Sequence, residues 1–180
     1  MIKLILVRHG QTTTTNKDTV LTIKGQEEAK LVANKLIDFS VNKIYVSNLT
    51  RAKETMTFYL DKLTNVKTDD PKIIISPKLA EIYRVIIGGP LKEGTSKNRF
   101  DNDKKRADEI FKELIKEKED VIVFAHGNLI KYFLSKVMNL NPRTFWENTT
   151  INNCSITIIE SNKDKNKFHV NIINDTAHLK

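Results

Sequence analysis

Residues 4–10, Leu4-Ile5-Leu6-Val7-Arg8-His9-Gly10, bring an unbroken apolar run to an end in two basic side chains and a glycine. A second apolar run, residues 121–125, ends in the same way at His126-Gly127. Strands that are apolar on both faces are typical of a parallel sheet covered by helices on both sides. Ligands of such sheets bind outside the carboxyl ends of the strands, so we expect both histidines to face one crevice.

Strands and helices alternate along most of the remaining chain. Apolar spacing and capping residues predict strands over residues 2–7, 44–46, 73–75 and 121–125, and helices over residues 25–38, from Ser47 or Asn48 to about 60, over 101–118 and after His126. Residues 84–100 contain several glycines and a proline, which predicts an irregular excursion. Residues 151–160 and 168–173 favour an antiparallel edge hairpin. The pattern predicts a mostly parallel α/β sandwich.

The composition is that of an ordinary globular protein, with 39% hydrophobic and 29% charged residues. We expect one domain spanning residues 1–180, which is long enough to bury a sizeable core. A single cysteine, Cys154, excludes an internal disulfide and a thiolate metal cluster, which favours a reducing, cytoplasmic setting. The first apolar run is too short for a signal peptide or a membrane span, so we expect no membrane partner.

The formal net charge of +8 invites a nucleic-acid interpretation. Lysine supplies most of the basic residues, and these lysines are scattered among acidic residues without an aromatic stacking stripe. We therefore expect a solvated basic surface and no nucleic-acid partner.

A cationic pocket is the expected feature of the crevice. Arg8 precedes the first histidine, and Arg51 lies at the start of the helix that follows the strand at residues 44–46, where a helix N-terminus favours an anion. Two arginines and two histidines on one sheet edge suit a phosphoryl group, which arginine can bind through two parallel hydrogen bonds.

Short motifs in order along nearly the whole chain resemble the histidine phosphatase superfamily, which has the phosphoglycerate mutase-like fold. The matching segments are Leu6-Val-Arg-His-Gly-Gln-Thr12, Leu21-Thr22 with Gly25 and Ala29, Ser47-Asn-Leu-Thr-Arg51-Ala52 with Thr55, Leu79-Ala-Glu81, Ala125-His126-Gly127, Asn153-Cys-Ser-Ile-Thr157 and Asn174-Asp-Thr-Ala-His178-Leu179. The resemblance implies a three-layer α/β/α sandwich with a mostly parallel central sheet and an antiparallel edge hairpin.

The resemblance also assigns roles to the residues that match the family motifs. It implies that His9 is the nucleophile that becomes phosphohistidine, that Arg8, Arg51 and His126 hold the phosphoryl oxygens, and that Glu81 donates a proton to the leaving group. Such chemistry needs no metal and no cofactor. The further substrate-binding candidates are Gly127, Gln11, Thr12, Asn16 and Arg84, of which Arg84 is equally compatible with a solvated surface position.

Two departures from the mutase pattern favour net hydrolysis. His9 and Leu21 are only twelve positions apart, without the Trp-Asn pair of mutases, and the glycine and tryptophan that usually follow the catalytic glutamate are missing. Several segments look most like the mitochondrial serine/threonine phosphatase branch related to phosphoglycerate mutase, without that branch's membrane anchor. We expect a stand-alone phosphatase acting on a phosphorylated small molecule or a phosphoprotein, with a homodimer as a possible assembly.

Two other functions stay open on the sequence. One is a phosphoglycerate mutase that depends on 2,3-bisphosphoglycerate, since it would use the same five residues. The other is a catalytically silent phosphate-binding protein, because a fold does not by itself determine a function. The presence of all five residues speaks against the silent protein.

Overall fold

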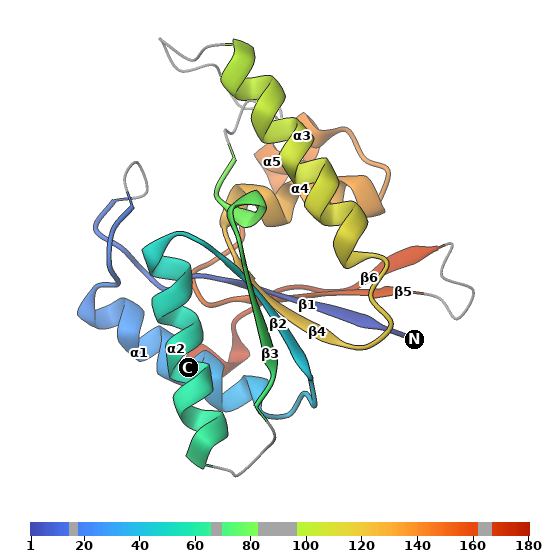
Figure 1. Ribbon diagram of the computed structural model, residues 1–180. Coiled ribbons are helices and arrows are strands. Elements are labelled where there is room, and N and C mark those ends of the chain that lie inside the picture. Colours follow the sequence, from blue (N-terminus) through green and yellow to red (C-terminus); the bar gives the residue numbers. More distant parts are fainter. Residues whose placement is uncertain (15–17, 66–69, 83–96, 162–166) are drawn as a thin grey trace.

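The structure is a computed structural model that describes residues 1–14, 18–65, 70–82, 97–161 and 167–180 (Figure 1). Its sheet has six strands in the order β3-β2-β4-β1-β5-β6. The strands are β1 (Lys3–Arg8), β2 (Lys43–Ser47), β3 (Lys72–Ser76), β4 (Val121–Ala125), β5 (Ile156–Ser161) and β6 (Phe168–Asp175).

The four strands β1 to β4 run parallel, and β5 and β6 add an antiparallel hairpin at one end of the sheet. In the β1–β4 pair, Arg8 lies opposite Ala125, so His9 and His126 leave neighbouring strands at the same level. The predicted mostly parallel sheet with an antiparallel edge hairpin is confirmed.

Helices cover both faces of the sheet (Figure 1). One layer holds α1 (Ile23–Leu36) and α2 (Thr50–Asn65), and the opposite layer holds α3 (Lys97–Leu114), α4 (Gly127–Val137) and α5 (Pro142–Asn148). Alternate residues of β1 divide between two hydrophobic clusters, with Ile5 and Val7 on the α1–α2 side and Leu4 and Leu6 on the α3–α4 side. This alternation gives each layer its own core and confirms the three-layer sandwich.

The predicted starts of the first two helices need correction. Helix α1 begins at Ile23, two residues before the predicted start, because the hydroxyl of Thr22 caps it by accepting the N–H of Gly25. Helix α2 begins at Thr50, and the carboxylate of Asp18 accepts the N–H of that residue at 2.8 Å. The hydroxyl of Ser47 instead accepts the N–H of Leu49, so the cap predicted at Ser47 or Asn48 is wrong. Helix α2 also continues to Asn65, beyond the predicted end.

The third predicted helix, over residues 101–118, is displaced along the chain. It begins at Lys97, so residues 97–100 of the predicted excursion form its first turn, and it ends at Leu114. Residues 84–96 of that excursion lie outside the described residues. The short helix α5, with Asn141 as its cap and Pro142 at its first position, was not predicted.

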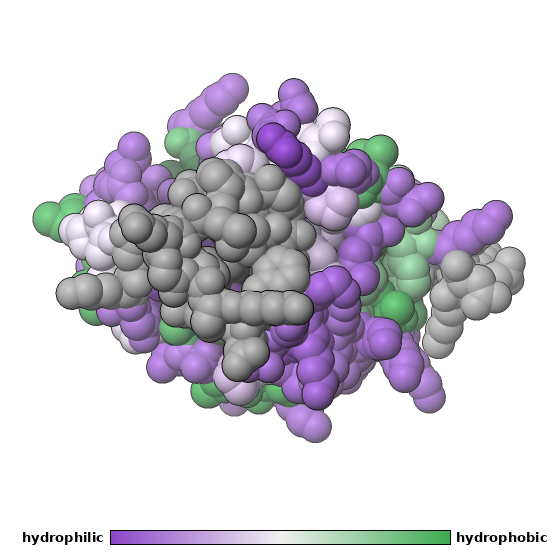
Figure 2. Space-filling model, turned by 90° about the horizontal axis from the view of Figure 1, so that it is seen from above, coloured by the Kyte–Doolittle hydropathy of each residue, from purple (hydrophilic) through white to green (hydrophobic). Residues whose placement is uncertain are grey.

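The coloured part of the surface in Figure 2 is mostly hydrophilic, and its hydrophobic residues lie in small separate groups. Among the described helices, none combines the length and the apolar character that crossing a bilayer requires.

Candidate active site

The two histidines that follow β1 and β4 lie side by side at the carboxyl edge of the sheet. Their ring centroids are 5.1 Å apart, with the planes inclined at 58°. Both side chains are buried, with 1% of His9 and none of His126 exposed. This geometry confirms the expectation from the sequence that both histidines lie at the same place on the sheet edge.

His9 is held with one particular nitrogen toward the site. Its Nδ1 lies 2.7 Å from the carbonyl oxygen of Gly10, and because a carbonyl can only accept, Nδ1 carries the proton. Nε2 therefore keeps its lone pair, and it accepts a hydrogen bond from Nε of Arg51 at 3.2 Å. Burial, aided by the charges of Arg8 and Arg51, lowers the pKa of His9 to about 3, although the Gly10 carbonyl opposes this shift. A neutral imidazole whose Nε2 carries a lone pair is the nucleophilic form, and attack through this lone pair requires Arg51 to move its hydrogen bond from Nε2 to the bound group.

A tight glycine contact fixes the backbone beside His9. A Cβ on Gly10 would lie 2.4 Å from the carbonyl oxygen of Gly25, and one on Gly25 would lie 2.2 Å from the carbonyl oxygen of Gln11. The N–H of Gly10 donates to Oγ1 of the buried Thr55 at 3.0 Å. The first turn of α1 can therefore pack directly on the His9 loop only if both positions are glycine.

His126 is held in the opposite way. Its Nε2 lies 2.8 Å from the hydroxyl of Ser47, and that hydroxyl already accepts the N–H of Leu49 at 3.2 Å. Ser47 keeps its one proton for a second bond, and when it donates that proton to Nε2 the imidazole proton of His126 lies on Nδ1. Nδ1 is buried and has no hydrogen-bond partner among the described residues. Burial, with His9, Arg51 and Arg8 adding to it, lowers the pKa of His126 well below its ordinary value.

The two predicted arginines lie at the same edge. Arg8 packs against the start of α4, where a Cβ on Gly127 would be 3.4 Å from its Nε. Its Nη1 donates to the carbonyl of Ile151, while its Nε is buried without a partner among the described residues. Arg51 is only 2% exposed, and its guanidinium lies 3.9 Å from the carboxylate of Asp18.

Glu81 lies just after the short 3₁₀ helix η1 (Pro77–Leu79) and reaches the N-terminus of α4. Its carboxylate accepts the N–H groups of Ile82 at 3.0 Å, Asn128 at 3.3 Å and Leu129 at 3.2 Å. Burial raises its pKa, outweighing these hydrogen bonds and the charge of Arg8. The structure thus brings Glu81 beside His126-Gly127. A proton donor at this position would lie next to a group bound between the two histidines.

Of the remaining candidates, Gln11 and Thr12 are described, and their recorded contacts do not join this cluster. The side-chain oxygen of Gln11 accepts the hydroxyl of Thr22 at 3.0 Å, and the hydroxyl of Thr12 donates to the carbonyl of Thr14 at 3.0 Å. A role for Gln11 or Thr12 in phosphate binding stays a prediction. Asn16 and Arg84 lie outside the described residues.

Several residues that support the site carried no assigned role in the sequence analysis. Besides Ser47 and Thr55, Asn153 donates its side-chain amide to the carbonyl of His9 at 2.8 Å, and the N–H of Cys154 donates to the carbonyl of Arg8 at 3.0 Å. The family-like segment from residue 153 to 157 was the available signal for this support. Arg106 donates a hydrogen bond to the main-chain carbonyl of Glu81, and no sequence pattern around Arg106 indicates this contact.

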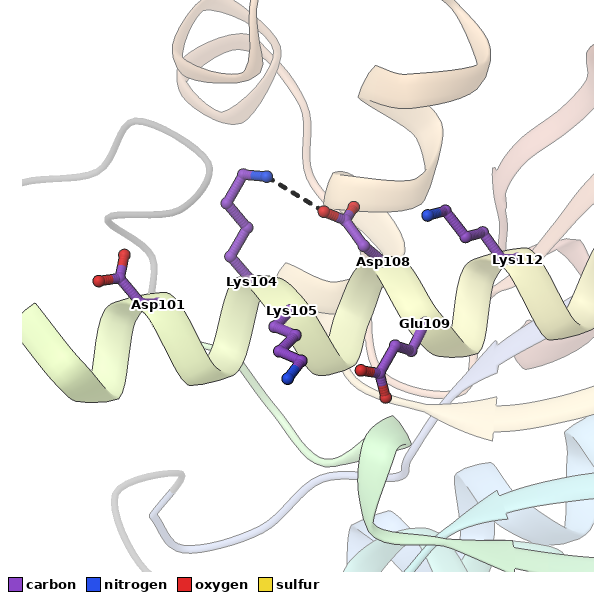
Figure 3. Close-up of a pocket in the computed structure, with 6 residues that line it drawn as sticks. All are labelled: Asp101, Lys104, Lys105, Asp108, Glu109 and Lys112. Atoms are coloured by element: carbon purple, nitrogen blue, oxygen red, sulfur yellow. Dashed lines mark hydrogen bonds and ion pairs between the residues drawn. The ribbon is translucent and has the colours of Figure 1, made fainter.

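A separate hollow of about 410 Å³ lies along α3 and is lined by charged side chains (Figure 3). Within it the Asp108 carboxylate binds Lys104 at 3.1 Å. It contains none of the candidate catalytic residues, and its lining charges alternate in sign along one helix, as on a solvated helix face. The lining residues are Asp101, Lys104, Lys105, Asp108, Glu109 and Lys112.

Comparison with known proteins agrees with this geometry. Residues 4–99 and 92–176 match the sequence profile of the histidine phosphatase superfamily (branch 1). The chain belongs to this superfamily. It is 26% identical over 187 residues to the mitochondrial serine/threonine-protein phosphatase Pgam5 of Caenorhabditis elegans, covering 98% of this chain and 63% of that protein. It therefore spans less than two thirds of the length of that relative.

Two further comparisons cover nearly the full length of both proteins. The chain is 26% identical to a probable phosphatase of Schizosaccharomyces pombe, over 99% of this chain and 95% of that protein. The solved structure of YhfR from Bacillus stearothermophilus superposes with a TM-score of 0.80 at 23% identity, over 100% of both chains. The phosphoglycerate mutase-like fold that the sequence motifs implied is thereby confirmed.

Proposed function

We propose that this protein is a phosphatase that hydrolyses phosphomonoesters through a phosphohistidine intermediate on His9. The observation that carries the proposal is a pair of buried nitrogens, Nε of Arg8 and Nδ1 of His126, that lack partners among the described residues, and both are donors when Ser47 donates to Nε2 of His126. Buried donors are rarely left unpaired in folded proteins. The oxygens of a phosphoryl group placed at Nε2 of His9 would accept from both donors and from Arg51.

The first half of the reaction transfers the phosphoryl group to the enzyme. Nε2 of His9 attacks phosphorus, the bond between phosphorus and the ester oxygen breaks, and protonated Glu81 gives its proton to the departing oxygen. The raised pKa of Glu81 favours the protonated form that this step needs. The arginines and His126 stabilise the charge on the three equatorial oxygens in the transition state.

The second half releases phosphate. Water attacks phosphorus, Glu81 as a carboxylate takes a proton from that water, and the bond between phosphorus and Nε2 breaks. Inorganic phosphate leaves, with His9 again neutral and Glu81 again protonated. The cycle uses no metal and no cofactor.

Hydrolysis is favoured over mutase chemistry by the short segment after His9. Thr12 and Leu21 form a β-bridge, and the N–H of Thr22 donates to the carbonyl of Gln11 at 2.9 Å. The two bridge residues are only nine positions apart in the sequence, which leaves few residues for a cover, whereas a mutase must enclose and re-orient a bisphosphate. We propose phosphorylated small molecules or phosphoproteins as substrates, and 2,3-bisphosphoglycerate-dependent mutase activity is the alternative.

The test compares three proteins on 4-nitrophenyl phosphate in the presence of a metal chelator. The wild type is expected to turn over, His9→Ala to lose activity, and His169→Ala to keep it, because His169 lies on β6 with 56% of its side chain exposed. Undiminished activity of His9→Ala would contradict the proposal. Interconversion of the two monophosphoglycerates after priming with 2,3-bisphosphoglycerate would instead support the mutase.

A further inference from the structure

The guanidinium of Arg106, on α3, has all five of its N–H donors engaged. Nε and Nη2 donate to Oδ1 of Asp103 at 2.9 and 2.6 Å. Nη1 donates to the carbonyls of Lys78 at 3.2 Å and Ala80 at 2.6 Å, and Nη2 also donates to the carbonyl of Glu81 at 2.7 Å. An arginine offers five donors, so this side chain is fully used in holding one short segment of main chain.

The segment that Arg106 holds leads from η1 to the carboxyl of Glu81. On its N-terminal side, Leu79 is fully buried and anchors the chain in the core. On its C-terminal side, the side-chain amide of Asn128 donates to the carbonyl of Ile82 at 3.3 Å. Between these anchors the carbonyls of Ala80 and Glu81 both accept hydrogen bonds from Arg106. Arg106 therefore fixes the position of the Glu81 Cα.

We propose that Arg106, oriented by Asp103, is the positioning residue for Glu81 as proton donor. The inference rests on the phosphatase function proposed above and deepens it. A proton donor acts only within hydrogen-bond reach of the leaving oxygen, so a small displacement of the Glu81 main chain reduces proton transfer. In the described contacts Arg106 does not touch His9, and we propose that it acts through Glu81.

The arrangement makes arginine hard to replace. Three carbonyls and one carboxylate oxygen surround a planar group, with two donors converging on the carboxylate oxygen and the other three each reaching a separate carbonyl. Lysine keeps the positive charge, but it has three donors on one nitrogen and cannot span the same acceptors. Arg106→Lys therefore tests the geometry of the clamp while leaving a cation at the site.

The experiment measures kcat/KM, which covers the steps up to departure of the leaving group, for a good and a poor leaving group. With an alkyl phosphate, whose alkoxide needs a proton, Arg106→Lys is expected to lose activity by roughly 10- to 100-fold, within the range of general acid catalysis. With 4-nitrophenyl phosphate, whose phenolate leaves unaided, the loss is expected to stay below about 3-fold. Glu81→Gln should show the same preference more strongly.

One variant serves as a matched control, and a second variant tests the same contact from the side of Asp103. Arg143→Lys changes an arginine on α5 that has 71% of its side chain exposed, and it should change kcat/KM for neither substrate. Asp103→Asn weakens the support of Arg106 from the other side and should give the same leaving-group pattern with a smaller loss. Thermal unfolding of each variant shows that the compared proteins are folded, and Asp103→Asn carries the test if Arg106→Lys does not fold.

The combined variant separates positioning from an independent role. Because both residues act through one proton transfer, Arg106→Lys is expected to add less than about 3-fold to the loss caused by Glu81→Gln on the alkyl phosphate. Equal losses on the two substrates, or independent losses that multiply in the combined variant, would overturn the inference. Failure of the wild type to hydrolyse either substrate would refute the phosphatase function itself.

Discussion

Strands β1 and β4 are neighbours in the sheet and both end in histidine followed by glycine, yet the two rings are held in opposite ways. His9 has Nδ1 bound to the carbonyl of the next residue, which leaves Nε2 with a lone pair. His126 has Nε2 bound to Ser47, which leaves Nδ1 without a partner among the described residues. The first ring presents an electron pair to the site, and the second presents a proton when Ser47 donates to its Nε2.

The difference teaches that a strand end places a histidine, while the partner of its other nitrogen sets its chemistry. The partner fixes the tautomer, and the tautomer decides whether the exposed nitrogen is a nucleophile or a donor. Two copies of one short motif can therefore supply two distinct functions of a single reaction. The following predictions separate these functions, beginning with the largest expected effect.

Removing each ring in turn should give unequal losses. His9→Ala is expected to lower kcat on 4-nitrophenyl phosphate by at least about 10⁴-fold, because the nucleophile is gone. His126→Ala should lose about 10²- to 10³-fold, the cost of one donor to a developing oxyanion, and should still form a phosphoenzyme. A larger loss from His126→Ala than from His9→Ala in steady-state assays would reverse the two roles.

The pH profile should be limited on its basic side by Glu81. The step that expels the leaving group needs protonated Glu81, whose pKa is raised, so kcat/KM for an alkyl phosphate should fall as pH rises through that pKa, by up to about tenfold per unit. His9 stays neutral above about pH 3 and adds no acidic limb there. Dividing the wild-type profile by that of Glu81→Gln cancels the ionisation of the substrate, and a flat ratio would remove Glu81 from the mechanism.

Breaking the tautomer control of His126 should give a moderate effect. In Ser47→Ala the proton of His126 is no longer directed to Nδ1, and kcat/KM is expected to fall about 5- to 10-fold, the size of one hydrogen bond. Ser135→Ala is the matched control, since it also removes a buried hydroxyl, one that donates to the carbonyl of Tyr132 within α4. Equal kinetics for the two serine variants would contradict the assignment.

The last prediction concerns stability and not catalysis. Because His9 titrates at about pH 3 in the folded protein and near its ordinary value of about 6.5 when unfolded, the unfolded chain binds the extra proton between these values. The free energy of unfolding should therefore fall as pH drops below about 6.5, by about 2 kcal/mol at pH 5 from His9 alone. Urea unfolding of His9→Asn should show a weaker dependence than the wild type, whereas His169→Asn should match the wild type.

Much of the fold could be predicted from apolar patterns. The strand over residues 121–125 was predicted with its exact bounds, because both of its neighbours and both covering layers require apolar residues there. The start of helix α3 was misplaced because residues 97–106 are polar apart from Phe100 and therefore carry no periodic apolar signal. The cap of α2 was wrong because Asp18, which is distant in sequence, supplies it.

The site was predictable to the extent that its residues lie at strand ends or match a family motif. His9 and His126 came from the apolar runs before them, and Glu81 came from the resemblance alone. Arg106 and Ser47 act through hydrogen bonds to residues 25 and 79 positions away, and no local pattern encodes those contacts. The substrate-facing candidates Asn16 and Arg84 remain predictions.

The central claim, that Nε2 of His9 receives the phosphoryl group, is tested most directly by trapping the phosphoenzyme. The wild type is mixed with an aryl phosphate, quenched in alkali because phosphohistidine is labile to acid, and analysed by phosphorus NMR and by mass spectrometry of its peptides. The account predicts one phosphohistidine, on His9 and substituted at Nε2, with none in His9→Ala. Phosphate on His126, or on Nδ1 of His9, would contradict it.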